Sequence, residues 1–182
     1  MIRIFDVIGS LLGLILLSPV LLAVYILLFM ETREPLFLQE RLGQHKRVFR
    51  LVKFRTMLKD TETVATHLVA PKAITRIGSI LRRTKLDELP QLWNVFIGDM
   101  SLVGPRPGLV NQAELAQYRE KYDVFNVRPG ITGLAQINKI DMSTPVELAR
   151  VDAKMIESFD IRAYFYYIIL TIFGYGQGDC IN

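Results

Sequence analysis

Two adjacent carboxylates, Asp87 and Glu88, lie just ahead of Pro90, with a group of cations immediately upstream. Carboxylate oxygens are the ligands that hard divalent cations such as Mg²⁺ prefer, and arginines such as Arg82 bind phosphate oxygens. A carboxylate can also attack phosphorus when a metal and a cation neutralise the phosphate. This pattern predicts a site where a divalent metal, held by Asp87 and Glu88, meets a phosphate group.

A structural role for the same two acids is the alternative. Acidic side chains in the first turn of a helix are stabilised by the partial positive charge at its N-terminus. Thr84 is placed to cap such a helix. On this interpretation Asp87 and Glu88 would stabilise a helix and bind no ligand.

Two arginines are placed on stiff turns. Arg106 lies between two prolines, and Arg128 precedes the Pro-Gly pair at 129–130, which suits a type II turn. Both are predicted to hold phosphates, the alternative being ordinary turns with solvated arginines. Lys53 and Arg55 are either further phosphate contacts or cations on an exposed strand. In the second case the aliphatic parts of their side chains would cover apolar surface while the charged ends stay in water.

The composition limits the class of protein. The 182 residues correspond to about one domain. Hydrophobic residues make up 51% of the chain, and its net charge of +4 fits anionic partners such as lipid head groups or nucleotides. One cysteine allows no internal disulfide. With only two histidines a His/Cys zinc cluster is disfavoured, so a catalytic metal would rely on oxygen ligands.

An almost wholly apolar run covers residues 8–30 and is long enough to cross a bilayer core as a helix. Ser18 and Pro19 interrupt it and predict a kink. The proline lacks an N–H, its ring clashes with the carbonyl of Ile15, and the Ser18 hydroxyl can bond back to the carbonyl of Leu14. The kinked segment either spans the membrane or forms a re-entrant hairpin that returns to the same face. A cleaved signal peptide is the third alternative.

Charge favours one side of the membrane for the rest of the chain. Arginines and lysines are concentrated in residues 33–55, after the apolar run, which predicts that this side is cytoplasmic. Asp6 lies near the start of the run and would be costly to bury in lipid.

The remaining sequence predicts an α+β fold that is mainly helical. A hairpin is expected from the strand-like residues 35–39 and 48–55, on either side of a turn at Gly43. Residues 56–71 are expected to form a surface loop with some helix. Helices are predicted at 74–81 (Ile77, Ile80 and Leu81 on one apolar face), at 89–96, at 113–122, and from 145 onward after a capping box at Thr144 and Glu147. Residues 161–173 are a core helix or a helix lying in the membrane interface.

Six short motifs occur in order along nearly the whole chain: residues 41–43, 53–57, 86–92, 98–101, 104–107 and 128–133. Together they resemble the bacterial sugar transferase family, the small monotopic phosphoglycosyl transferases. The resemblance implies a re-entrant membrane helix at residues 1–31, broken at Ser18-Pro19. A cytoplasmic-face catalytic domain with interfacial amphipathic helices is implied for residues 32–182. The implied location is the bacterial inner membrane.

The resemblance also implies a reaction. Such enzymes transfer a sugar-1-phosphate from a UDP-sugar to undecaprenyl (polyprenyl) phosphate and release UMP, the first membrane step of glycan assembly. They use Mg²⁺ and an Asp-Glu pair that falls on Asp87 and Glu88, with Asp87 as the nucleophile and Glu88 at the metal or in proton handling. Arg106 matches an arginine near the phosphates, and Arg128 one on the nucleotide side. Substrate contacts are implied for Lys53, Arg55, Arg82, Arg106 and Arg128, and downstream glycosyltransferases are candidate partners.

The chain departs from the family pattern near its C-terminus. Tyr164 stands where an aspartate is common, and Lys154 and Met155 stand where aromatics are common. These differences leave local packing or sugar contacts open. Two rival functions are a membrane-anchored nucleotide-sugar hydrolase and a basic membrane-tethered module for nucleic acid or anionic lipid. Binding of nucleic acid is not expected, because the cations lie beside acids and prolines and not along one helical face.

Overall fold

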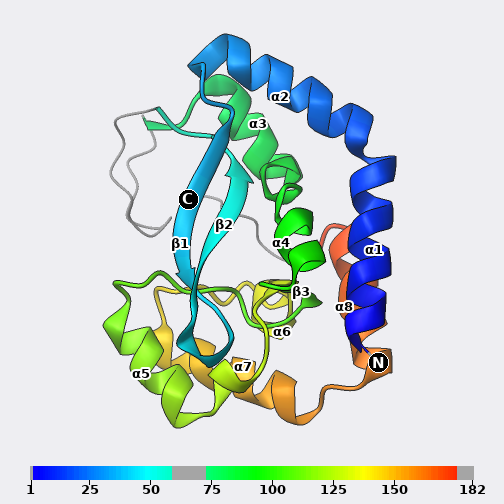
Figure 1. Ribbon diagram of the computed structural model, residues 1–182. Coiled ribbons are helices and arrows are strands. Elements are labelled where there is room, and N and C mark those ends of the chain that lie inside the picture. The colour runs from blue at the N-terminus through cyan, green and yellow to red at the C-terminus, as the bar shows by residue number, and fades with distance from the viewer. Residues whose placement is uncertain (1, 59–72, 176–182) are drawn as a thin grey trace.

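The computed structural model describes residues 2–58 and 73–175, so most of the predicted loop at 56–71 lies outside the described residues. The fold is a mainly helical α+β domain, as predicted (Figure 1). Its helices are α1 (Ile2–Leu16), α2 (Ser18–Thr32), α3 (Arg76–Thr84), α4 (Gln91–Ile97), α5 (Ala113–Lys121), α6 (Leu134–Ile137), α7 (Pro145–Glu157) and α8 (Ile161–Ile172). Its strands are β1 (Leu36–Leu42), β2 (Val48–Phe54), β3 (Ser101–Val103) and β4 (Gly130–Thr132).

The strands form two small sheets. β1 and β2 are the predicted antiparallel hairpin, with Leu36 opposite Phe54 and Leu42 opposite Val48. β3 and β4 pair in parallel and join segments that are distant in the sequence. Figure 1 shows the hairpin on one side of the molecule, α1 on the other, and α5 and α7 beneath.

The predicted kink is confirmed, since α1 and α2 meet at a bend of 61° (Figure 1). The Ser18 hydroxyl donates to the carbonyl of Ile15, at 2.7 Å, and not to that of Leu14. Pro19 has no N–H to donate to the Ile15 carbonyl, and the serine hydroxyl takes the place of that missing donor. Among the described residues no single helix is long and apolar enough to cross a membrane, whereas the bent pair together passes that test.

Asp6 anchors α1 to the rest of the domain. Its side chain is 2% exposed, and its Oδ1 accepts hydrogen bonds from the Ser101 hydroxyl, the Leu102 amide and the Tyr164 hydroxyl, each at 2.9 Å. Burial and the neighbouring Asp6 carboxylate raise the pKa of the Tyr164 hydroxyl, so it remains a donor at neutral pH. The cost of burying Asp6 is thus offset by three donors from β3 and α8.

Tyr164, one of the departures from the family pattern, therefore has a defined structural role. Replacing it with phenylalanine removes one donor from a buried carboxylate and is expected to lower the free energy of unfolding by about 1–3 kcal/mol. The matched control is Tyr166→Phe on the same helix, whose side chain is 58% exposed. Its effect should stay within about 0.5 kcal/mol. Denaturant unfolding of both variants measures the difference, and equal losses would contradict the assignment.

The predicted type II turn at 129–130 is wrong. Gly130 does not have the positive φ that this turn requires and instead begins β4. The glycine is needed for another reason: a Cβ at Gly130 would lie 2.0 Å from the backbone nitrogen of Gly104. Close approach of two backbones, which a local turn pattern cannot reveal, explains the residue.

Three other local expectations are corrected. Thr144 makes no side-chain cap, because its hydroxyl points to the carbonyl of Asp141, at 3.5 Å, although Pro145 does open α7. Ile80 is 51% exposed, so the apolar face of α3 consists of the buried Leu81 and the partly buried Ile77. Thr84 ends α3 and donates to the carbonyl of Ile80, so it does not cap the turn that carries the acids.

The C-terminal helix α8 has one buried face, as predicted for a core helix, and one exposed apolar face. Tyr164 and Tyr167 are buried in a cluster with Met155 and Val103, as expected for a core helix. The opposite face leaves large side chains exposed: Phe165, Tyr166, Ile169 and Ile172. Apolar side chains are likewise exposed along α1 and α2, including Ile4, Ile8, Leu12, Ile15, Leu22, Ile26 and Phe29. Such exposed apolar surface marks an interaction face.

Candidate active site

The two carboxylates lie in a single 3₁₀ turn, Leu86–Glu88, directly after α3. Thr75 caps the start of helix α3, where its hydroxyl accepts a hydrogen bond from the Gly78 amide, and Lys85 follows the end of the helix in the left-handed conformation (φ 59°). A non-glycine residue rarely adopts this conformation, and here it turns the chain inward. As a result Asp87 is 2% and Glu88 7% exposed.

Glu88 lies between two of the predicted substrate-binding cations. Its Oε1 is 2.6 Å from Nη2 of Arg106 and 4.0 Å from Nζ of Lys53. The Lys53 and Glu88 side chains are less than 10% exposed, and that of Arg106 is 20% exposed. The structure thus brings Lys53, Glu88 and Arg106 together, with Asp87 adjacent in the chain, in a poorly solvated cluster where charges interact strongly.

The loop that carries Arg106 is held by its backbone. Its three consecutive carbonyls, at residues 105–107, each accept a hydrogen bond from a different part of the fold. The donors are the Gly130 amide at 2.9 Å, Arg119 Nη1 at 2.8 Å and Arg41 Nη1 at 2.9 Å. The two prolines restrict the backbone, and these bonds fix it further, so Arg106 is presented from a rigid loop.

The other predicted substrate arginines occupy different places. Arg82 is buried, and its Nε donates to the Thr56 hydroxyl at 2.8 Å. Arg55 pairs with Glu34 at 3.2 Å, and Arg128 donates to the carbonyl of Gly98 at 2.9 Å. Among the described residues, the structure therefore ties Arg55 and Arg128 to other partners and does not bring them to Glu88.

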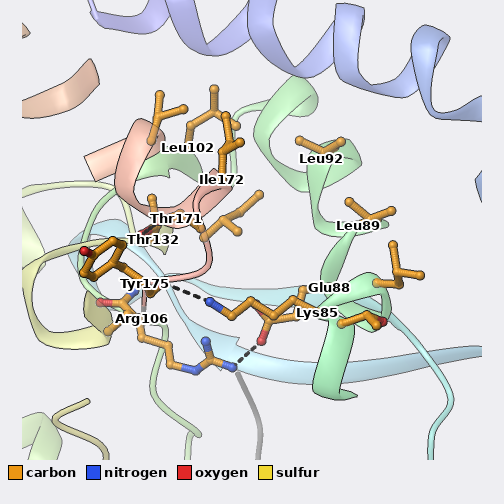
Figure 2. A pocket seen from close by; sticks show the side chains of 15 residues that line it. Lys85, Glu88, Leu89, Leu92, Leu102, Arg106, Thr132, Thr171, Ile172 and Tyr175 are labelled. Atoms are coloured by element: carbon orange, nitrogen blue, oxygen red, sulfur yellow. Dashed lines mark hydrogen bonds and ion pairs between the residues drawn. The ribbon is translucent and has the colours of Figure 1, made fainter. Parts of the chain in front are cut away.

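A cavity of about 270 Å³ opens beside the charged cluster. Figure 2 shows Arg106 and Glu88 pointing toward each other at one end, with Lys85 nearby, and the apolar side chains Leu92, Leu102 and Ile172 at the other end, beneath the N-terminal helices. Lys85 Nζ donates to the carbonyl of Tyr175 at 3.0 Å. The cavity thus has a charged end and an apolar end.

Several lining residues had not been predicted from the sequence. They are Thr132, Gln136 and Thr171, which come from three separate segments. The hydroxyls of Thr132 and Thr171 lie within 2.5 Å of each other and join β4 to α8. No local pattern distinguishes these residues, because only the packing of β4, α6 and α8 places them at one cavity.

Asp87 and Glu88 are the side chains of this site that could contribute ligands to a magnesium ion. The described residues contain no group of three or more histidine, cysteine or acidic side chains that could hold a metal. They do offer the adjacent carboxylates of Asp87 and Glu88. Mg²⁺ commonly binds through one or two carboxylates and completes its coordination with water and substrate phosphates. Two carboxylates beside two cations therefore suit a metal that arrives with a phosphorylated substrate.

Known proteins resemble this chain along most of its length. The family model described as "Bacterial sugar transferase" matches residues 1–177. The chain is 42% identical over 147 residues to the exopolysaccharide production protein PSS of Rhizobium leguminosarum bv. phaseoli, which covers 74% of this chain and 72% of that protein.

Two longer relatives have more specific names. The chain is 42% identical to the UDP-galactose-lipid carrier transferase of Erwinia amylovora, over 75% of this chain and 32% of the relative. It is 41% identical to the UDP-glucose:undecaprenyl-phosphate glucose-1-phosphate transferase of Klebsiella pneumoniae, over 75% of this chain and 30% of the relative. The match spans about a third of the length of these two relatives.

Proposed function

Because the chain belongs to the bacterial sugar transferase family, we propose that it transfers a sugar-1-phosphate from a UDP-sugar to undecaprenyl (polyprenyl) phosphate and releases UMP. The observation that carries this proposal is the position of the acid pair. Glu88, paired with Lys53 and Arg106, lies at the charged end of a cavity whose other end is apolar, and the buried Asp87 directly precedes it in the same turn.

The proposed reaction has two displacements at one phosphorus atom. A carboxylate oxygen of Asp87 attacks the phosphorus that bears the sugar, and the bond from that phosphorus to the bridging oxygen breaks, so UMP leaves. An oxygen of polyprenyl phosphate then attacks the same phosphorus and regenerates the Asp87 carboxylate. Lys53 and Arg106 lie where they can neutralise the phosphate oxygens, which lowers the electrostatic cost of bringing a carboxylate to a phosphate.

Asp87 and Glu88 are proposed to hold Mg²⁺. When bound, the ion would neutralise and orient the phosphates of the donor. Glu88 also pairs with Arg106, so the cation that binds phosphate is fixed by the same residue that serves the metal. Chelation is expected to stop transfer, and readdition of Mg²⁺ to restore it.

The shape of the cavity supports a lipid acceptor. Its apolar end is lined by Leu92, Leu102 and Ile172 and lies beneath α1 (Figure 2). A polyprenyl chain would be accommodated there, with its phosphate directed to Lys85 and Arg106. The exposed apolar residues of α1, α2 and α8 support contact with a bilayer, with α1 and α2 as a re-entrant segment. We place the catalytic domain on the cytoplasmic face of the bacterial inner membrane, at the first membrane step of glycan assembly.

The direct test is a screen of UDP-sugars with and without polyprenyl phosphate, which measures UMP release and the lipid product. Release of UMP together with a lipid-linked sugar diphosphate, only when both substrates and Mg²⁺ are present, would support the proposal. Release of a free sugar phosphate without the lipid would instead indicate a hydrolase. Absence of turnover with every sugar, together with steeply salt-dependent binding of nucleic acid, would indicate a binding module.

The re-entrant arrangement predicts where the N-terminus lies. Replacing Ser18-Pro19 by Ala-Leu restores an amide donor for the Ile15 carbonyl and removes a proline that costs about 3 kcal/mol or more in a straight helix. The straightened helix should cross the bilayer and carry residue 2 to the far side, while the basic flank keeps the catalytic domain cytoplasmic.

A cysteine at position 2, in a Cys180→Ser background, reports this topology through a membrane-impermeant maleimide applied to intact cells. Labelling is expected in the Ala-Leu variant and not in the parent with Ser18-Pro19. Labelling of the parent itself would show that the native segment already spans the membrane, and the re-entrant proposal would be wrong.

A further inference from the structure

A buried ion pair lies behind the loop that presents Arg106. Arg119 on α5 is 3% exposed and Asp152 on α7 is 1% exposed. Nε and Nη2 of Arg119 donate to the same oxygen of Asp152, Oδ2, at 3.0 and 2.7 Å. The remaining terminal nitrogen, Nη1, donates to the backbone carbonyl of Arg106 at 2.8 Å.

This buried ion pair is not expected to add much to the folding stability of the protein. Taking two charges out of water is costly, and well-packed apolar side chains often stabilise a protein as much as a buried ion pair does. Burial raises the pKa of Asp152 against the opposing effect of Arg119. Asp152 Oδ1 is also buried and accepts no hydrogen bond from the described residues. The arrangement therefore calls for a reason other than the stability of α5 against α7.

The geometry of Arg119 indicates what this other reason is. The planar guanidinium of Arg119 is fixed by Asp152 on one edge and points its third nitrogen at the Arg106 carbonyl. From that carbonyl the chain continues to the Arg106 guanidinium, which meets Glu88 at 2.6 Å. A continuous set of contacts thus leads from α7 to the acid pair.

We propose that Arg119 and Asp152 are positioning residues, which hold Arg106 in the orientation that meets Glu88 and, in the proposed reaction, the phosphates of the donor. This inference rests on the proposed function for its effect on activity. Its structural part, that Arg119 fixes Arg106, is independent of the substrate.

Arg119→Lys separates positioning from charge. A lysine keeps the positive charge beside Asp152 but lacks the fork that reaches two partners at once. Loss of a charged hydrogen bond to the Arg106 carbonyl should lower kcat/KM for the UDP-sugar by about 10- to 100-fold. Arg150→Lys is the matched control: Arg150 is exposed on α7, its Nε donates to the Tyr122 hydroxyl at 3.3 Å, and its activity should stay within about twofold of wild type.

The decisive measurement is a double-mutant cycle with Arg106→Ala. If Arg119 acts through Arg106, adding Arg119→Lys to Arg106→Ala should cost less than about twofold more. An undiminished loss in that background would overturn the proposal, because it would show that Arg119 acts through the general stability of the fold. Asp152→Asn, which keeps an oxygen acceptor for Arg119, serves in the same cycle if Arg119→Lys does not fold.

A second test of the positioning role does not require enzyme activity. Phenylglyoxal modification, followed by peptide mass spectrometry, should label Arg106 faster in Arg119→Lys than in wild type or Arg150→Lys, because its loop is less fixed. An unchanged rate would overturn the positioning role whatever the enzyme's substrate. Faster labelling without turnover on any UDP-sugar would leave the positioning role standing and contradict the proposed function.

Discussion

Asp87→Asn is expected to reduce sugar-phosphate transfer by roughly 10³-fold or more, the scale of loss seen when a covalent nucleophile is removed. The amide is nearly the same size as the carboxylate, so the 3₁₀ turn and its burial should survive. However, an amide oxygen is a poor nucleophile toward phosphorus and a weaker ligand for Mg²⁺. Transfer by purified variants, normalised to folded protein, measures the effect.

The covalent step can be observed directly. Wild-type protein incubated with a UDP-sugar but no lipid acceptor should gain the mass of a sugar phosphate on a peptide containing Asp87, and Asp87→Asn should not. Asp123→Asn is a matched control, since Asp123 is exposed and has a positive φ of 56°, which asparagine adopts readily. An active Asp87→Asn variant, together with no adduct on wild type, would rule out the covalent mechanism.

Arg106→Ala should have the second largest effect. Truncating one partner of a buried charged contact costs about 2–5 kcal/mol, which corresponds to roughly a 30- to 5,000-fold loss of kcat/KM. Two changes contribute: the donor phosphates lose a cation, and Glu88 loses the partner now 2.6 Å away. Steady-state kinetics in the UDP-sugar measures the loss.

Lysine at the same position distinguishes charge from geometry. Arg106→Lys retains a cation but not the planar fork that can contact Glu88 and a phosphate together, so it should recover only part of the activity. Full recovery would show that charge alone matters there. Near-wild-type activity of Arg106→Ala would show that the rigid loop has only a structural purpose.

Local signals explain which parts of the fold could be predicted. Alternating residues indicated the β1–β2 hairpin, and Pro19 indicated the bend between α1 and α2, because both depend on neighbours in the sequence. Gly130 was misinterpreted because its requirement comes from the backbone of Gly104 across a parallel pair. Thr144 carries a capping signal, but the Asp141 carbonyl takes its hydroxyl.

The candidate active site likewise combines features that depend on sequence neighbours with features that depend on tertiary packing. The adjacency of Asp87 and Glu88 is visible in the sequence, and its proximity to Lys53 and Arg106 is a matter of tertiary packing. Arg119 gave no signal, because a charged residue on a polar helix is usually solvated, and only the packing of α5 on α7 buries it. Arg128 looks equivalent to Arg106 in the sequence, and Arg55 is a further candidate phosphate contact, yet the fold ties them to Gly98 and Glu34.

The anchoring of Asp6 has a consequence for biosynthesis. The hydrogen bond from Tyr164 joins residues 158 positions apart. At a translation rate of about 5–20 residues per second, the ribosome makes Asp6 roughly 8–30 s before Tyr164. Until then the carboxylate lacks one of its three donors, which raises the free-energy cost of burying it. The full set of contacts that holds α1 on the domain can therefore form only after α8 has been synthesised, so we expect the docking of α1 to be completed late in the folding of the nascent chain.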